Sequence, residues 1–406
     1  MTDWKTYRAE DFCLMVTDGT HDSPKPQAEG LYLITSKHLK PSGIDFSSAN
    51  RISETDYNKI IQRSKVEQYD ILFSMIGTIG NIHRVTTHIV DFAVKNMGIF
   101  KMGGDADKSL WMYYWLQSPI AQEYIQSRIT GSTQGYLTLG NLRDFPVCVP
   151  PLEEQRRIVG ILGVIDDKIE NNRRINTNLE LQAQALYKQW FVDFEFPNEE
   201  GKPYKSSGGK MVDSELGLIP EGWSVGDIYK YVNVVYGAPY KSALFNERKD
   251  GNPLIRIRDL KTFSPQYYTQ EILPNTEFIN AGDVVAGMDA EFVPCLWMGE
   301  KGVLNQRCCK FVGKQDSISN YYVMFLVKPE LEFVQSYKTG TTVSHLGKSD
   351  IDKFVVVQPP LTVIEKFSKI ANALLNNKAN LAKENITLVT LRDTLLPKLM
   401  NGEIKL

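Results

Sequence analysis

Residues 146–169 read PVCVPPLEEQRRIVGILGVIDDKI, and a similar pattern returns at residues 355–378 as VVVQPPLTVIEKFSKIANALLNNK. In both stretches an apolar run of strand character leads to a proline pair, and Pro359-Pro360 follows Pro150-Pro151 by 209 residues. Proline ends a strand because it has no N–H to donate, and its fixed φ suits the first turn of a helix. The chain is therefore predicted to be a tandem repeat in which a globular region precedes a long helix.

Residues at a seven-residue spacing follow each proline pair. The rows are Ile158, Ile165, Asn172, Leu179 and Leu186 in the first stretch and Phe367, Leu374, Leu381, Leu388 and Leu395 in the second. A companion row is expected three or four residues further on, in the second stretch at Ile370, Asn377, Glu384 and Leu391. Two such rows are typical of a coiled-coil seam. Because each repeat supplies one helix, we expect an intramolecular antiparallel coiled coil, and a coil that joins two chains is the alternative.

The expected fold class is α+β, with two repeated α/β regions separated by two long helices and related by a pseudo-twofold axis. The expected boundaries are 1–150 for the first globular region, 151–195 for the first helix, 196–222 for a linker, 223–358 for the second globular region and 359–406 for the second helix. The linker contains the stretch EGKPYKSSGGK at residues 200–210, whose glycine, serine and proline residues indicate an exposed connection.

Composition excludes several classes of protein. The chain has 406 residues, of which 42% are hydrophobic and 23% charged, and its formal net charge of −2 does not by itself indicate DNA binding. The polar N-terminal residues do not resemble a signal peptide, and no stretch approaches the roughly 18 apolar residues of a membrane span. The five cysteines contain no CxxC pair, which favours a reducing, cytoplasmic location over a disulfide framework or a zinc site.

No catalytic constellation is recognisable in the sequence. Gly347-Lys348-Ser349 resembles the end of a phosphate-binding loop, but Thr342 stands where the first glycine is required. The fragment Glu200-Gly201-Lys202 resembles part of a nuclease motif, but it lies in the polar linker. The five histidines are scattered along the chain. We therefore expect a chain that is not catalytic, binds no cofactor and holds no metal ion.

Several segments resemble the specificity (S) subunit of type I restriction–modification systems. They are PPLEEQRR at 150–157, IDDKIENNRRIN at 165–176, LYKQWFVDF at 186–194, the linker from KSSGGKM at 205–211 to IPEGW at 219–223, and LLPKLMNGEI at 395–404. The resemblance covers essentially the whole chain. One departure is the second helix, which begins with LTVIE at 361–365 and lacks the EEQR of the first.

The resemblance implies two target-recognition domains that each read half of a bipartite double-stranded DNA site with a nonspecific central gap. The two helices would be the spacer, and the heptad rows would form the spacer coil and contact partners. Catalysis would lie in the partners: two modification subunits that use S-adenosylmethionine to methylate adenine, and restriction subunits, when present, that use ATP and Mg²⁺. The resemblance thus implies a cytoplasmic protein that directs methylation or cleavage and has no membrane partner.

Candidate DNA-reading residues are side chains that can donate to or accept from base edges. In the first region these are Thr20, His21, Lys25, Lys37, His38, Arg51, Arg84, Gln134 and Tyr136, and in the second they are Lys241, Arg256, Arg258, Lys261, Asn305, Arg307 and His345. On a strand, Arg256 and Arg258 would share one face. Each cation could equally be a solvated surface residue.

Two other functions compete with this interpretation. A coiled-coil scaffold whose globular regions bind protein fits the even distribution of charge, and a self-contained nuclease is disfavoured by the missing motifs. The whole-chain resemblance outweighs both, and a non-catalytic DNA-specificity subunit is the leading hypothesis.

Overall fold

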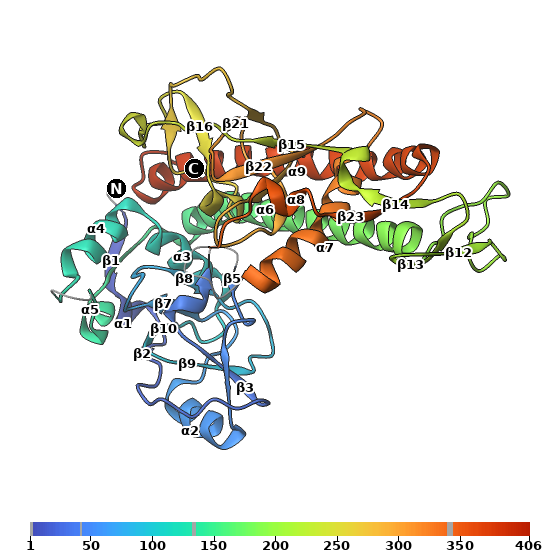
Figure 1. Ribbon diagram of the computed structural model, residues 1–406. Coiled ribbons are helices and arrows are strands. Elements are labelled where there is room, and N and C mark those ends of the chain that lie inside the picture. The colour runs from blue at the N-terminus through green and yellow to red at the C-terminus, as the bar shows by residue number, and fades with distance from the viewer. Residues whose placement is uncertain (1–2, 41–42, 132–134, 339–343) are drawn as a thin grey trace. The chain divides into compact units, whose positions relative to one another are not determined.

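The computed structural model describes residues 3–40, 43–131, 135–338 and 344–406 (Figure 1). The chain forms two compact units: unit 1 consists of Met1–Lys168 and Leu388–Leu406, and unit 2 consists of Ile169–Thr387. The two long helices, α6 (Leu152–Tyr187) and α9 (Leu361–Met400), each contribute residues to both units. In the part of the chain that the structure describes, no helix is long and apolar enough to cross a membrane.

Unit 1 is built on a four-stranded antiparallel sheet with the order β2-β10-β7-β8. Its strands are β2 (Met15–Asp18), β7 (Ile71–Ser74), β8 (Ile82–Arg84) and β10 (Met97–Lys101). In a second sheet β3 (Leu31–Ile34) pairs antiparallel with β6 (Asn50–Ile52) and parallel with β9 (Phe92–Val94). A third pair, β1 (Lys5–Arg8) and β11 (Pro146–Val149), leads directly into α6. The remaining short elements are α1 (Ala9–Phe12), β4 (Leu39–Lys40), β5 (Gly43–Ile44), α2 (Glu54–Ser64), α3 (Ala106–Leu116), α4 (Pro119–Arg128) and α5 (Leu139–Arg143).

Unit 2 repeats this topology. Its four-stranded sheet has the order β15-β22-β19-β20, formed by β15 (Val232–Tyr236), β19 (Val284–Gly287), β20 (Pro294–Leu296) and β22 (Cys308–Gly313). Strand β16 (Asn252–Ile255) pairs antiparallel with β17 (Tyr268–Thr269) and parallel with β21 (Gly302–Leu304), which also pairs with β18 (Phe278–Ile279). The pair β14 (Ser224–Asp227) and β23 (Val355–Gln358) leads into α9. Helices α7 (Asn320–Lys338) and α8 (Lys348–Ile351) and the linker hairpin of β12 (Met211–Ser214) and β13 (Gly217–Pro220) complete the unit.

The predicted duplication is therefore confirmed at the level of strand order. Individual contacts repeat as well: the Leu137 N–H donates to the Met75 carbonyl at 2.9 Å, and the Leu346 N–H donates to the Met288 carbonyl at 2.7 Å. Leu137 and Leu346 are separated by the same 209 residues as the proline pairs. The fold is α+β, as the sequence predicts.

The long helices belong to the hydrophobic cores. In unit 1, Ile158 and Leu162 of α6 pack with the core that contains Trp111 and Trp115 of α3. In unit 2, Phe367 of α9 lies in a core of aromatic side chains. Residues from the two helices thus bury apolar surface in each unit, which stabilises both the helices and the sheets they cover.

Polar contacts show that α6 and α9 are antiparallel. Arg392 Nη1 lies 3.0 Å from Asp166 Oδ1, Asn172 Nδ2 donates to Asn385 Oδ1 at 2.9 Å, and Lys378 pairs with Glu180. The residue number falls along α9 as it rises along α6, so the helices run in opposite directions. The predicted intramolecular antiparallel pair is confirmed.

Of the companion row predicted for the second helix, Glu384 does contact α6, since its Oε2 accepts from Asn172 Nδ2 at 2.8 Å. The other contacts lie one residue later than predicted. Ile370 and Leu391 are 46% and 45% exposed, whereas Ala371 is buried and Lys378, Asn385 and Arg392 pair with side chains of α6. A coiled-coil seam alternates steps of three and four residues, because the helix has 3.6 residues per turn. From Phe367 the step is four residues to Ala371, and the sequence pattern suggested three.

We expect Asp166→Ala to destabilise unit 1. Asp166 accepts from the hydroxyl of Tyr114 at 2.8 Å and pairs with Arg392, so its removal leaves the Tyr114 hydroxyl without its acceptor and Arg392 with Asp393 as its remaining carboxylate partner. The expected loss is about 1–3 kcal/mol in the free energy of unfolding. Urea denaturation followed by tryptophan fluorescence measures it, with the exposed neighbour Asp167→Ala as the matched control. Equal stability of the two variants would contradict the expectation.

Candidate nucleic-acid interface

Three separate chain segments meet at one end of the central sheet of unit 1. Gly98 at the start of β10 lies opposite Asp18 at the end of β2, and Met97 lies opposite Ser74 at the end of β7. The segments that follow β2 and β7 therefore come together with the turn that precedes β10. We call this end of the sheet edge 1.

Unit 2 has an equivalent end, which we call edge 2. Cys309 in β22 lies opposite Tyr236 at the end of β15, and Cys308 lies opposite Gly287 at the end of β19. The segments that follow β15 and β19 meet the turn that precedes β22. Each unit thus presents loops from three strands at one place, which is how a scaffold commonly displays binding residues.

Edge 1 gathers three of the predicted residues of the first region. Thr20 forms a bridge with Lys95 in the turn before β10, His21 follows it, and Tyr136 forms a bridge with Ile76 after β7. His21 and Tyr136 are exposed. Gln134, also predicted, lies outside the described residues.

An aspartate organises edge 1. Asp18 Oδ2 lies 3.0 Å from His21 Nε2, and Asp18 Oδ1 accepts from Arg63 Nη2 at 2.9 Å. His21 Nδ1 also lies 2.8 Å from the side-chain oxygen of Asn96. Arg63 was not predicted, because it belongs to helix α2, 45 residues from Asp18, and no motif marks it.

Edge 2 brings together Asn305, Arg307 and His345, all three of which were predicted. Arg307 Nη1 lies 3.0 Å from Asp289 Oδ2, and the His345 ring donates from Nδ1 to Asp289 Oδ1 at 2.7 Å, since a carboxylate can only accept. Asn305 is 9% exposed and accepts from the Arg307 N–H at 3.1 Å through its side-chain oxygen. Asp289, which joins the group, was not predicted.

Glycine allows the backbones to approach closely at both edges. The Thr20 N–H donates to the Val94 carbonyl at 3.0 Å, and the Ala238 N–H donates to the Leu304 carbonyl at 2.9 Å. A Cβ on the preceding Gly19 would stand 2.3 Å from the Val94 oxygen, and one on Gly237 would stand 2.1 Å from the Asn305 oxygen. These distances are too short for any other residue without movement of the strands.

The opposite ends of the same strands are closed by buried ion pairs. In unit 1 Lys101 Nζ donates to Asp70 Oδ2 at 2.8 Å, and burial raises the pKa of Asp70 against the opposing effect of Lys101. In unit 2 Lys310 lies 3.0 Å from Asp283. The pairs fix the sheet ends that lie away from the edges.

Two predicted residues are engaged inside unit 1. His38 is 1% exposed, and its Nδ1 accepts from the Thr35 N–H at 2.9 Å. Arg84 donates from Nε to Ser109 Oγ at 2.9 Å, and burial lowers its pKa. His38 is thus buried in this conformation, whereas Arg84 is partly buried. Their burial comes from tertiary contacts that no local pattern reveals.

The strand expected for Arg256 and Arg258 is wrong. Strand β16 ends at Ile255, and residues Ile257–Leu260 form a 3₁₀ turn. The turn begins because the Asp259 carboxylate accepts from the Arg256 N–H at 3.0 Å. The Arg256 guanidinium lies 4.3 Å from the ring centroid of Tyr267, as that of Arg51 lies 4.2 Å from Tyr32. The remaining predicted cations, Lys25, Lys37, Lys241, Arg258 and Lys261, are exposed.

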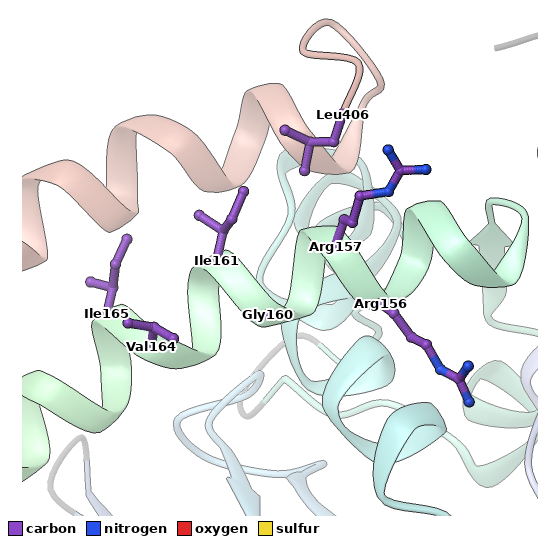
Figure 2. Close-up of a pocket in the computed structure, with 7 residues that line it drawn as sticks. All are labelled: Arg156, Arg157, Gly160, Ile161, Val164, Ile165 and Leu406. Carbon is purple, nitrogen blue, oxygen red and sulfur yellow. The ribbon is translucent and has the colours of Figure 1, made fainter.

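Helix α6 carries an exposed apolar groove (Figure 2). Gly160 leaves its floor open, and Ile161, Val164 and the terminal Leu406 line it beside Arg156 and Arg157. Val164 is 70% exposed. Exposed apolar surface of this kind is typical of a contact with another molecule.

The described residues contain no group of three or more histidine, cysteine, aspartate or glutamate side chains that could hold a metal ion. All five cysteines are free. The polar groups that do converge, at edges 1 and 2, present exposed donors and acceptors, which suits binding to base edges or phosphates.

Comparison with known proteins adds the family. Residues 1–181 and 220–390 match the family described as the type I restriction modification DNA specificity domain. The chain is 29% identical over 331 residues to the type I restriction enzyme MjaIX specificity subunit of Methanocaldococcus jannaschii, covering 74% of this chain and 70% of that protein. It is 22% identical to the putative MjaX specificity subunit of the same organism, over 99% and 94% of the two chains.

A solved structure shares the fold. The crystal structure of a type I restriction–modification system S subunit from M. genitalium superposes with a TM-score of 0.56, covering 98% of this chain and 96% of that one at 15% identity.

We expect Gly19→Ala to disrupt edge 1. The new Cβ would overlap the Val94 carbonyl, so the segment after β2 must move away from the end of β9, at a cost of about 1–3 kcal/mol in stability. Gly160→Ala in the same unit is the matched control, because its Cβ would meet nothing within 4 Å and alanine favours a helix. Thermal unfolding should show a lower Tm for Gly19→Ala alone. An unchanged Tm for both variants would refute the required close approach.

Proposed function

Because this chain belongs to the type I restriction–modification DNA specificity family, we propose that each of its two units reads one half of a bipartite double-stranded DNA site. Membership makes it a DNA specificity subunit, which is not itself catalytic. Two recognition units in one chain account for a two-part site, and an unspecified gap lies between the parts.

The observation that carries this proposal is the duplication of the edge with different side chains. Thr20 in edge 1 corresponds to Ala238 in edge 2, since both follow the close-approach glycine. Tyr136 corresponds to His345, because each directly precedes a leucine with an equivalent hydrogen bond. The N–H of Leu137 donates to the residue after β7, and the N–H of Leu346 donates to the residue after β19. Because base readout depends on the donors and acceptors that a side chain offers, the two edges would read different sequences.

We assign residues 1–150 and 223–358 to the two target-recognition domains, 196–222 to the linker, and 151–195 and 359–406 to the spacer helices. The seam contacts support the last assignment, because polar pairs along α6 and α9 fix their register. A fixed register gives the spacer a defined length, and the length of the central gap would follow from it.

The partners in this proposal are double-stranded DNA, two modification subunits and, where present, restriction subunits. S-adenosylmethionine, ATP and Mg²⁺ would be bound by those subunits, and no residue of this chain is assigned to them. The exposed groove of Ile161, Val164 and Leu406 offers apolar surface for a partner subunit on the spacer.

Methylation mapping tests whether each unit reads one half of the DNA site. Cells that carry this chain with its modification subunits should methylate a bipartite motif with an unspecified centre. Exchange of residues 1–150 for those of a relative with another specificity should change one half of the motif and leave the other unchanged. The chain without exchange is the control. A motif without a gap, or a change of both halves after the exchange, would contradict the proposal.

Insertion of one heptad into both spacer helices tests whether helix length sets the length of the central gap. Because Asn172 faces Glu384 and Asn385, the matched insertion sites follow Asn172 in α6 and Glu384 in α9. Seven residues add about 10 Å of helix, which corresponds to about three base pairs. The gap should lengthen accordingly while both half-site sequences persist. Insertion into only one helix is the control and should abolish methylation, since it breaks the polar register. If the double insertion were active and kept the original gap, helix length would not determine the length of the gap.

A further inference from the structure

Both edges contain the same trio of side chains, an arginine and a histidine that share one aspartate. In edge 1 Asp18 binds Arg63 at 2.9 Å and His21 at 3.0 Å, one through each carboxylate oxygen. In edge 2 Asp289 binds Arg307 at 3.0 Å and His345 at 2.7 Å, again one through each oxygen. We call these groups triad 1 and triad 2.

The triads are not inherited from the duplication. Asp18 ends β2, and the equivalent position before Gly237 at the end of β15 is Tyr236. Asp289 forms a bridge with His345, and the equivalent bridge in unit 1 joins Ile76 and Tyr136. The same three residue types are thus assembled from different positions of the repeat. A recurrence of this kind points to a shared task rather than to a shared scaffold contact.

In each triad the aspartate is largely buried and the arginine is exposed to solvent. The side chains of Asp18 and Asp289 are 10% and 24% exposed, whereas those of Arg63 and Arg307 are 59% and 57% exposed. Arg63 uses only Nη2 in its contacts with Asp18 and Gly19, and Arg307 uses only Nη1. Within the described residues the other guanidinium nitrogens make no hydrogen bond.

The chemistry favours base contact over phosphate contact. A guanidinium with two free donors matches the O6 and N7 acceptors of guanine in the major groove. A carboxylate beside it holds the planar fork in place and reduces the rotamer freedom lost on binding. The same carboxylate would repel a phosphate, so an arginine intended for the backbone gains nothing from this neighbour.

We propose that Arg63 and Arg307 are the base-reading arginines of the two units, each for a guanine in its own half-site, and that Asp18 and Asp289 are positioning residues that hold them. The inference rests on the proposed reading of one half-site by each unit. His21 and His345 occupy the second oxygen of each aspartate and so fix the direction in which its first oxygen points.

Methylation motifs of single-arginine variants test the reading role. Arg307→Ala, expressed with the modification subunits, should lose discrimination at one G·C pair of one half-site by roughly 5- to 150-fold, and the other half-site should be unchanged. Arg63→Ala should do the same in the other half-site. Lys210→Ala removes an exposed cation paired with Glu221 in the linker hairpin and is the matched control with no effect on the motif.

Conservative variants separate reading from folding. Arg307→Lys keeps the charge but removes the planar fork, so it should lose discrimination at the same base pair as Arg307→Ala while the Tm stays that of the parent chain. Asp289→Asn should keep the preferred base but discriminate less, because the anchor no longer carries a charge.

Three outcomes would overturn the inference. One is an unchanged motif in the arginine variants, and another is relaxation at positions in both half-sites. The third is an equal loss of affinity for all DNA sequences, together with a decrease of about one in the slope of log affinity against log salt concentration. That result would indicate a phosphate contact. Failure of the proposed function itself is distinguishable, because the parent chain would then give no bipartite motif.

Discussion

The polar contacts between α6 and α9 fix the register of the two helices, and the packing of both units depends on this register. Lys378, Asn385 and Arg392 recur every seven residues along one face of α9 and pair with Glu180, Asn172 and Asp166 of α6. An apolar seam could slide by a heptad at little cost, but displaced partly buried polar groups would lose their partners. Because both helices also enter the cores of both units, this register determines where each helix residue packs.

Much of the fold was predictable because its sequence pattern occurs twice in the chain. The proline pairs, the strands before them and the heptad rows recur at one offset, so each copy supports the interpretation of the other. The error in the companion row shows the limit of such periodicity. Ile370 is apolar and Lys378 is charged, yet Lys378 faces the partner helix because Glu180 neutralises it there. A hydrophobic pattern alone assigns such a position to solvent.

The candidate interface was predictable only in part. Thr20, His21, Asn305, Arg307 and His345 were candidates because they offer donors and acceptors in predicted loops, and the strand register places them at the two edges. Arg63 and Asp289 were missed because their roles depend on contacts across 45 and 56 residues of chain. His38 and Arg84 have the right chemistry for contact with DNA, but tertiary packing buries His38 and partly buries Arg84.

The charges along the seam are divided unequally between the two helices. The acidic members, Asp166 and Glu180, lie on α6, whereas the basic members, Lys378 and Arg392, lie on α9. Two copies of α6 would place Asp166 and Glu180 in a shared seam without the cations that pair with them here. Two copies of α9 would lack both of these carboxylates, and Glu384 would be the acidic side chain that remains in contact with the seam. Like-with-like pairing is therefore penalised, and each half of the duplicated chain selects its unlike half.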